Sequence, residues 1–215
     1  MTPRLTAHPS GVLLGAQLLA IIAYPFLEGS RAGTAGLGVL SVVVVGLALW
    51  VVRSTPALTV IAVVFGAPAV VLTVLEAIHP HTDGLALASS LVHAPFYFYV
   101  AYSTIRYLFH DDKVTPDELY AIGAAFTVVA WGFAYLYVAT SIVWSGSIAP
   151  LGTSSTRFFE LLFLSFTTLT SVGLSDILPL DAHARSLMIL EQVAGVLYVA
   201  MVISRLIAMS ARSRD

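Results

Sequence analysis

The residues whose types and spacing suggest chemistry lie at 167–179, in the segment TTLTSVGLSDILP. A run of small hydroxyl residues crosses lipid poorly, because polar backbone at membrane depth must be enclosed by protein or face water. The segment nevertheless stands between two strongly hydrophobic stretches of the chain. We therefore expect it to line a polar path, in which backbone carbonyl oxygens could replace the water shell of a small cation.

Composition indicates the class of protein. The chain has 215 residues, of which 58% are hydrophobic and only 10% are charged, and its mean hydropathy is +0.91. Soluble domains carry about 25% charged residues, so we expect an integral membrane protein in contact with lipid. The net charge of −2 gives no sign of a nucleic-acid partner. The absence of cysteine excludes disulfides, thiolate metal sites and thiol catalysis.

Hydrophobic segments predict the helices, since a membrane span needs about 20 apolar residues. Six segments are long enough: about 11–28, 33–52, 57–78, 85–109, 117–144 and 184–209. A seventh, at about 156–170, is shorter, although Ser155 or Thr156 can cap it and Glu160 suits its first turn. We predict an all-α membrane protein with six transmembrane helices plus a re-entrant helix that stops partway and a loop that returns to the same side.

The distribution of positive charge predicts the orientation. Cytoplasmic loops carry an excess of Lys and Arg, and that excess arises when both termini are cytoplasmic. The cytoplasmic side would then hold Arg4, Arg53, Arg106, Lys113, Arg205, Arg212 and Arg214, and the outer side Arg31, Arg157 and Arg185. The segment at 85–109 has one arginine, Arg106, where a voltage sensor would have several. We therefore expect no voltage sensor of that kind.

A short helix followed by a glycine-containing loop suits a cation pathway. Consecutive carbonyls can point the same way only if the backbone alternates in handedness, which favours glycine where φ is positive. A helix that directs its carbonyl end inward adds negative potential there. Residues 156–176 contain each part: a short helix, a Thr-rich helix end, Gly173 in the loop, and the carboxylate of Asp176 beyond it.

Here the chain resembles the pore domain of potassium channels, especially the bacterial members. The pattern of that family is T-T-V-G-Y-G-D, and residues 170–176 read TSVGLSD. The stretch FFELLFLSFTTLTSVG is similar to the family's pore helix, LMILEQVAGVLYVAMVISRLI to its inner helix, and AWGFAYLYVA to its outer helix. The resemblance implies a pore domain at 113–210, preceded by a four-helix region at 1–112 and followed by a short cytoplasmic tail at 211–215.

The resemblance also implies the site. Carbonyl oxygens of Ser171, Val172, Gly173 and Leu174 would bind ions, with Ser175 and Asp176 at the outer mouth. Four copies of the chain would surround one pore, because a single loop cannot encircle an ion. No cofactor is implied, and no metal beyond the permeant K⁺, or Na⁺ as well if the filter is relaxed. The implied location is the bacterial plasma membrane.

Three positions of the inner helix are candidates for gating. Gly195 stands where a hinge glycine often occurs in the family, and Val199 and Ile203 share its helical stripe. Val199 or Ile203 could form a hydrophobic constriction. Plain helix packing explains the same stripe equally well, and both interpretations stay open.

The filter departs from the family pattern at two outer positions. Ser175 replaces the second glycine, and a non-glycine residue in left-handed geometry costs roughly 1–2 kcal/mol. Either Ser175 accepts that strain, or the outer filter is built differently. Leu174 replaces the tyrosine, whose hydroxyl ties the family's filter to the surrounding helices.

The expected function is a tetrameric channel that passes monovalent cations, chiefly K⁺, and has no enzymatic activity. One alternative is a non-selective cation channel with a relaxed filter. Another is a secondary transporter with a broken-helix site, which would usually show a second break in its other half. An intramembrane enzyme is disfavoured, since the chain has no G-x-S-x-G, no H-E-x-x-H and no paired intramembrane aspartates.

Two further intramembrane residues are functional candidates. His93 could be a proton-sensitive switch, but we favour a histidine hydrogen-bonded within the helix bundle. Glu191 is a candidate because carboxylates are rare within membrane segments. We expect Glu191 instead to bond the back of the short helix at 156–170.

Overall fold

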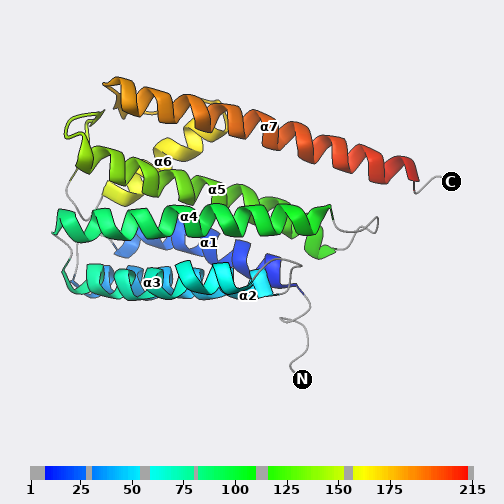
Figure 1. Cartoon of the computed structure of the whole chain (residues 1–215), viewed down its shortest axis with the longest axis horizontal. Coiled ribbons are helices and arrows are strands. Elements are labelled where there is room, and N and C mark those ends of the chain that lie inside the picture. The colour runs from blue at the N-terminus through cyan, green and yellow to red at the C-terminus, as the bar shows by residue number, and fades with distance from the viewer. Residues whose placement is uncertain are drawn as a thin grey trace.

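The computed structural model describes residues 8–27, 31–53, 59–79, 82–109, 116–152 and 157–212. This part of the chain folds into seven helices and one pair of two-residue strands (Figure 1). The elements are α1 (Pro9–Leu27), α2 (Arg31–Arg53), α3 (Thr59–Ile78), α4 (Asp83–Leu108), α5 (Pro116–Val143), β1 (Ile148–Ala149), α6 (Arg157–Leu169), β2 (Leu178–Pro179) and α7 (Ala182–Arg212). The fold is all-α, as the sequence predicts.

Five of the described helices are long and apolar enough to cross a membrane. They are Pro9–Leu27, Val60–Ile78, Asp83–Leu108, Pro116–Val143 and Ala182–Ile207. The predicted span at 33–52 falls within α2, whose apolar portion Gly36–Val52 is shorter than the others. That segment as a sixth span remains a prediction.

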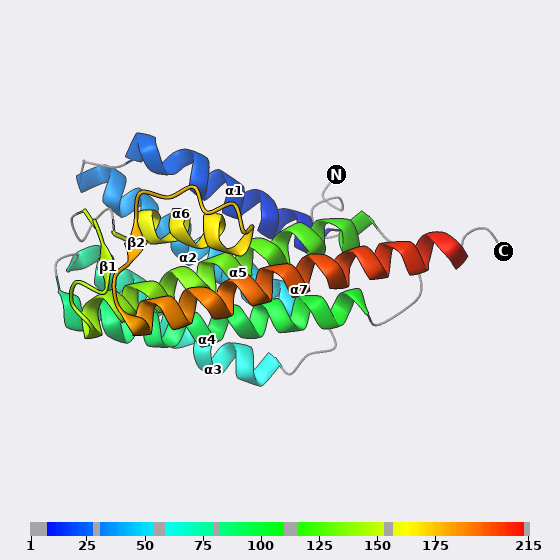
Figure 2. The same cartoon turned by 90° about the horizontal axis from the view of Figure 1, so that it is seen from above.

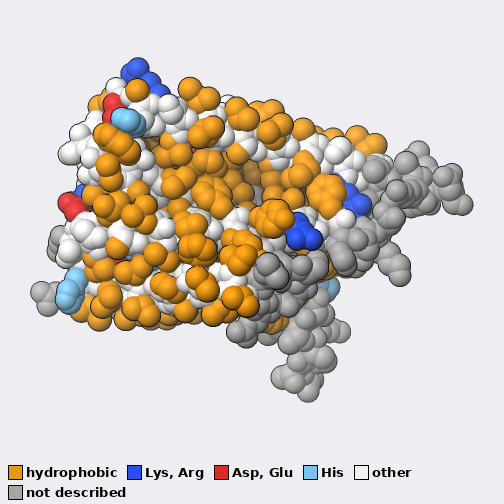
Figure 3. All heavy atoms as spheres, viewed as in Figure 1, with side chains coloured by type: hydrophobic (Ala, Val, Ile, Leu, Met, Phe, Trp, Pro, Cys, Tyr) orange, Lys and Arg blue, Asp and Glu red, His pale blue; other side chains and the backbone are white. Residues whose placement is uncertain are grey.

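The surface fits a membrane environment. On the face seen in Figure 3, hydrophobic side chains cover the middle of the molecule, and charged side chains lie toward its two ends. Many large apolar side chains of the described residues are exposed, among them Phe26, Val60 and Leu190. Water would penalise such exposure, whereas lipid does not.

The long helices run roughly along one axis of the molecule, and the short helix α6 lies obliquely to α5 and α7 (Figure 1). Helices α1 to α4 pack as a group on one side of α5, and α7 lies on the other side with α6 beside it (Figures 1 and 2). The start of α1 and the end of α7 lie at the same end of the molecule. Two apolar cores share α5: one contains Tyr97 and Trp131, and the other contains Tyr137, Leu161 and Met188.

The segment around α6 follows the re-entrant course that the sequence predicts. Helix α6 has 13 residues, roughly 20 Å at 1.5 Å per residue, which is too short to cross a hydrocarbon core of about 30 Å. Figure 2 shows the chain leaving the far end of α6 and running back beside it to β2. Strand β2 pairs antiparallel with β1, which precedes α6. The chain therefore returns to the end from which α6 started.

Local hydrogen bonds explain how the elements around α6 begin. The Glu160 carboxylate accepts the Gly152 N–H at 2.8 Å and so anchors the preceding loop to the first turn of α6. The Asp181 carboxylate accepts the Ala184 N–H at 2.9 Å and caps α7. The predicted caps Ser155 and Thr156 lie outside the described residues, as do the boundary at 112–113 and the end of the tail at 213–215.

One buried carboxylate ties the start of α1 to the start of α5. Asp117 accepts the Ser10 N–H at 3.0 Å and the Ser10 hydroxyl at 2.9 Å, and both residues are buried. This carboxylate stands at the positive ends of two helices, where negative charge is stabilising.

We expect Asp117→Ala to lower the free energy of unfolding by about 1–3 kcal/mol, because it leaves buried donors of Ser10 without an acceptor. The measurement is thermal or denaturant unfolding of the purified chain in detergent. Asp176→Ala is the matched control, since Asp176 is exposed. Equal unfolding midpoints for the two variants would contradict the assigned role of Asp117.

Candidate ion pathway

Backbone N–H groups of residues 171–173 bind the segment after α6 to the last turn of that helix. The Ser171 N–H donates to the Thr168 carbonyl at 2.9 Å. The N–H groups of Val172 and Gly173 both donate to the Thr167 carbonyl at 3.0 Å. These bonds satisfy carbonyls in the last turn of α6, which a helix end otherwise leaves without partners. Within the described chain, no donor is bonded to the Ser171 or Val172 carbonyl oxygen, so both are available to a ligand.

The backbone alternates in handedness at two positions of this segment. Ser171 has φ 58° and Gly173 has φ 69°, and both lie in the left-handed region. Gly173 adopts this geometry without penalty, as its place in the motif suggests. Ser171 is the residue that bears strain, a cost of roughly 1–2 kcal/mol.

The sequence left open whether Ser175 adopts strained left-handed geometry or whether this part of the loop is built differently, and the backbone favours the second. It does not have positive φ, so it carries no left-handed strain. Its N–H donates to the Gly173 carbonyl at 3.0 Å, and its hydroxyl oxygen accepts the Ile177 N–H at 3.1 Å. The outer part of the segment is therefore built as a tight turn, and the Gly173 carbonyl already has a donor.

The predicted ion-binding residues lie together on the surface of the chain. Ser171, Val172, Gly173 and Leu174 are consecutive and exposed, with the Leu174 side chain 74% exposed, and Asp176 is exposed beyond them. An open groove of about 550 Å³ separates this segment from α7. Its lining includes Thr168, Ser171 and Gly173 on one side and Gln192 and Val196 on the other.

Glu191 links three helices behind the segment. On α7, it accepts hydrogen bonds from the hydroxyls of Ser165 on α6 and Tyr137 on α5. Glu191 is 0% exposed, and Ser165 and Tyr137 are also buried. The Ser165 hydroxyl also lies 2.8 Å from the Ala130 carbonyl of α5. The prediction that Glu191 bonds the back of the short helix is confirmed.

Gly195 lies where α7 approaches the end of α6. A Cβ atom at this position would be 1.9 Å from the Leu169 carbonyl oxygen, closer than atoms can pack. Val199 and Ile203 are 48% and 51% exposed, whereas Gly195 is buried. The close approach explains glycine at 195 by packing. The hinge and gate roles of Gly195, Val199 and Ile203 remain predictions.

His93 is hydrogen-bonded within the helix bundle, as favoured above. Its Nδ1 lies 2.9 Å from the Ser89 carbonyl, and its Nε2 lies 3.0 Å from the Thr73 hydroxyl. Its ring stacks on Tyr135 with centroids 4.5 Å apart. Sequence reasoning missed the nearby Glu76, whose carboxylate accepts the Ser89 hydroxyl at 2.7 Å. The signal was present, because Glu76 is an acidic residue within an apolar segment.

The hydrogen bonds that join Glu191 to Ser165 and Tyr137 should make non-additive contributions to stability. We expect Tyr137→Phe and Glu191→Leu to lower the free energy of unfolding each on its own. The double variant should lose less than the sum, with a coupling of roughly 0.5–3 kcal/mol, because both single changes remove the same hydrogen bond. Chemical unfolding in detergent measures the cycle. Gln192→Leu, at the exposed neighbouring position, is the control, and strict additivity would exclude the shared bond.

We expect Gly195→Ala to destabilise the chain by about 1–3 kcal/mol and to displace the end of α6, because the new methyl group overlaps the Leu169 carbonyl. Thermal unfolding of the purified variant measures the loss. Gly15→Ala is the matched control, because a Cβ atom there would meet nothing within 4 Å. Similar stability of the two variants would show that α6 and α7 do not approach this closely.

Comparison with known proteins gave a family match for the C-terminal part of the chain. Residues 124–212 match the family model described as ion channel. The match includes most of α5, all of α6, residues 170–176 and all of α7. Searches of curated proteins and of solved structures gave no match. Over residues 124–212, the chain is similar to ion channels.

Proposed function

We propose that this protein is an ion channel subunit that passes monovalent cations, with K⁺ preferred, through a tetrameric pore lined by carbonyl oxygens. The observation that carries the proposal is the hydrogen bonding of residues 171–173. Their N–H groups all bond back to α6, while the Ser171 and Val172 carbonyls have no donor among the described residues. This arrangement leaves oxygen dipoles for a permeant ion. The family match over residues 124–212 supports the ion-channel part of the proposal.

Assembly is part of the proposal, because one filter segment can contact only one side of an ion. The groove between this segment and α7 is open in the single chain. Apolar side chains of α7 bordering or near it, including Val193, Val196 and Leu197, are more than half exposed. Neighbouring copies that enclose a central pore would cover this surface, which gives the apolar residues a function in assembly.

The proposed mechanism is passive flow down the electrochemical gradient. Asp176 at the outer mouth would raise the local cation concentration, and the carbonyls at 171–174 would replace water stepwise. The carbonyl end of α6 would stabilise a cation in the cavity below. Val199 and Ile203 would line the inner part of the path, where a hydrophobic constriction can close it by dewetting.

A specific observation favours a relaxed filter as the second candidate. The Gly173 carbonyl accepts the Ser175 N–H, so it offers less to an ion than a free carbonyl does. Fewer carbonyl groups around the ion would weaken discrimination between K⁺ and Na⁺. The transporter alternative is less supported, because α3 and α4 continue unbroken through Pro68 and Pro95.

We expect cation current from the purified chain in a planar bilayer with K⁺ on one side and Na⁺ on the other. The double variant Leu174→Tyr with Ser175→Gly should move the reversal potential toward the K⁺ equilibrium value. Glycine at 175 can adopt left-handed geometry and release the Gly173 carbonyl. The single variant Leu174→Tyr is the control, since it keeps the Ser175 turn.

An unchanged reversal potential in the double variant would show that the turn at Ser175 does not limit selectivity. A native mass measurement accompanies the current. A monomer with no current would contradict the pore and favour the transporter alternative, since a transporter site fits within one chain.

A further inference from the structure

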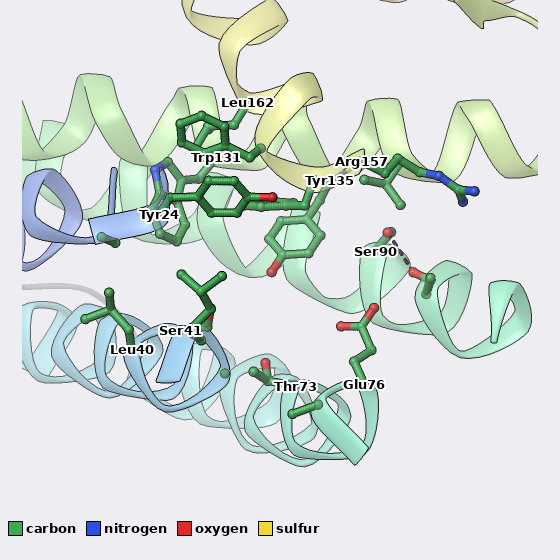
Figure 4. A pocket seen from close by; sticks show the side chains of 18 of the residues that line it. Tyr24, Leu40, Ser41, Thr73, Glu76, Ser90, Trp131, Tyr135, Arg157 and Leu162 are labelled. Carbon is green, nitrogen blue, oxygen red and sulfur yellow. Dashed lines mark hydrogen bonds between the residues drawn. The ribbon is translucent and has the colours of Figure 1, made fainter. Parts of the chain in front are cut away.

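A cavity outside the proposed ion path lies among the N-terminal helices. It has a volume of about 210 Å³ and is enclosed by side chains of α1 to α6 (Figure 4). Its α6 wall consists of Arg157, Phe158, Phe159 and Leu162, the first residues of the helix that precedes the filter. At the exposed end of the cavity, Arg157 forms an ion pair with Asp83 at 3.0 Å.

One carboxylate of this cavity has no cationic partner. Glu76, on α3, accepts a hydrogen bond from Ser89, and no described Lys or Arg pairs with it. Arg157 is already neutralised by Asp83. His93 approaches Glu76 through Ser89, whose hydroxyl lies 3.1 Å from Nδ1 and donates to the Glu76 carboxylate at 2.7 Å. The Glu76 carboxyl group therefore has further oxygen lone pairs with which to accept hydrogen bonds from a ligand.

Two serine hydroxyls of the lining are left as acceptors toward the cavity. Ser41 donates its proton to the Leu37 carbonyl at 2.9 Å, and Ser90 donates to the Ala86 carbonyl at 2.7 Å. A hydroxyl that donates to its own helix has only lone pairs left for a ligand. Glu76 and these two serines together suit a ligand that donates hydrogen bonds, such as an ammonium group.

Aromatic side chains form the opposite wall. Tyr24 stacks on Phe159 with centroids 3.9 Å apart, and Trp131 and Tyr135 both pack against Phe158. Figure 4 shows Trp131 on α5 across the cavity from Glu76 on α3. Trp131 is 3% exposed, and its indole N–H is buried without an acceptor in the described chain. Aromatic faces attract cations, and the indole N–H could donate a hydrogen bond to an oxygen of the ligand.

We propose that this cavity binds a small organic cation, with an ammonium group at Glu76, an apolar body against the aromatic wall, and an oxygen acceptor for Trp131. The site lies apart from the proposed filter, but its wall includes the first turns of α6. Bound ligand therefore contacts the helix that positions residues 171–173.

The test measures binding to the purified full chain in lipid nanodiscs by equilibrium dialysis. The probe is 2-phenoxyethylammonium, and its neutral counterpart is 2-phenoxyethanol. We expect the cation to bind about tenfold more tightly. Glu76→Gln should remove that difference by weakening the cation alone, because glutamine still accepts the Ser89 hydroxyl. Ser41→Phe, which fills the cavity, should weaken both compounds.

Asp176→Asn is the matched control, because it removes a carboxylate at the proposed outer mouth and not in the cavity. Unfolding midpoints of all variants verify that each is folded. The proposal is overturned if both probes bind equally, if Glu76→Gln leaves the preference intact, or if Asp176→Asn abolishes it. The assay needs no current, so its failure is distinguishable from failure of the proposed channel.

Discussion

The structure depends on the way the last carbonyl groups of the short helix α6 are satisfied, since they would lie within the membrane if α6 is re-entrant. Water is absent from the bilayer core, so such groups need donors from protein. The carbonyls of Thr167 and Thr168 receive them from the N–H groups of residues 171–173. This fixes the direction of the following peptide units and leaves the Ser171 and Val172 carbonyls without a donor in the described chain. The same bonds that stabilise the end of α6 therefore create the candidate ion ligands.

A short helix also needs support along its length, and two contacts with α7 supply it. Glu191 bonds Ser165 in the middle of α6, and Gly195 allows the backbone of α7 to meet the end of α6 at Leu169. The Glu191 contact is a directional hydrogen bond, whereas the Gly195 contact depends on the absence of a side chain. Glu191 and Gly195 lie one helical turn apart on α7, so the two contacts act on the same side of that helix. The strand pair β1–β2 closes the segment at the other end.

The N-terminal helices have a different chemistry from the C-terminal part. Their interior contains a polar group of Thr73, Glu76, Ser89 and His93 next to an aromatic wall, whereas the groove beside α7 has only uncharged lining residues such as Thr168 and Gln192. Helix α6 contacts both environments: its first turns line the N-terminal cavity, and its last turn holds the filter segment. A ligand in the cavity and an ion in the pore would therefore share one structural element.

The sequence by itself determined the helical fold and the short re-entrant helix, and it predicted where a filter segment would lie. These follow from local quantities: the length of each apolar run, the place of Gly173, and the polarity of residues 167–176. It also favoured the roles of Glu191 and His93, because a polar side chain within an apolar helix must find a partner.

Only the tertiary structure decided the backbone geometry of residues 171–176 and the existence of the cavity. Ser171 rather than Ser175 takes positive φ, because the N–H groups after Ser171 must turn back to Thr167, a contact between helix end and loop that residue type does not encode. The Leu169 carbonyl against Gly195 explains the glycine by packing, a contact between two helices that the sequence alone does not reveal, and the hinge role stays a prediction. The Glu76 cavity needs six helices to enclose it, and such long-range packing has no signature in local spacing.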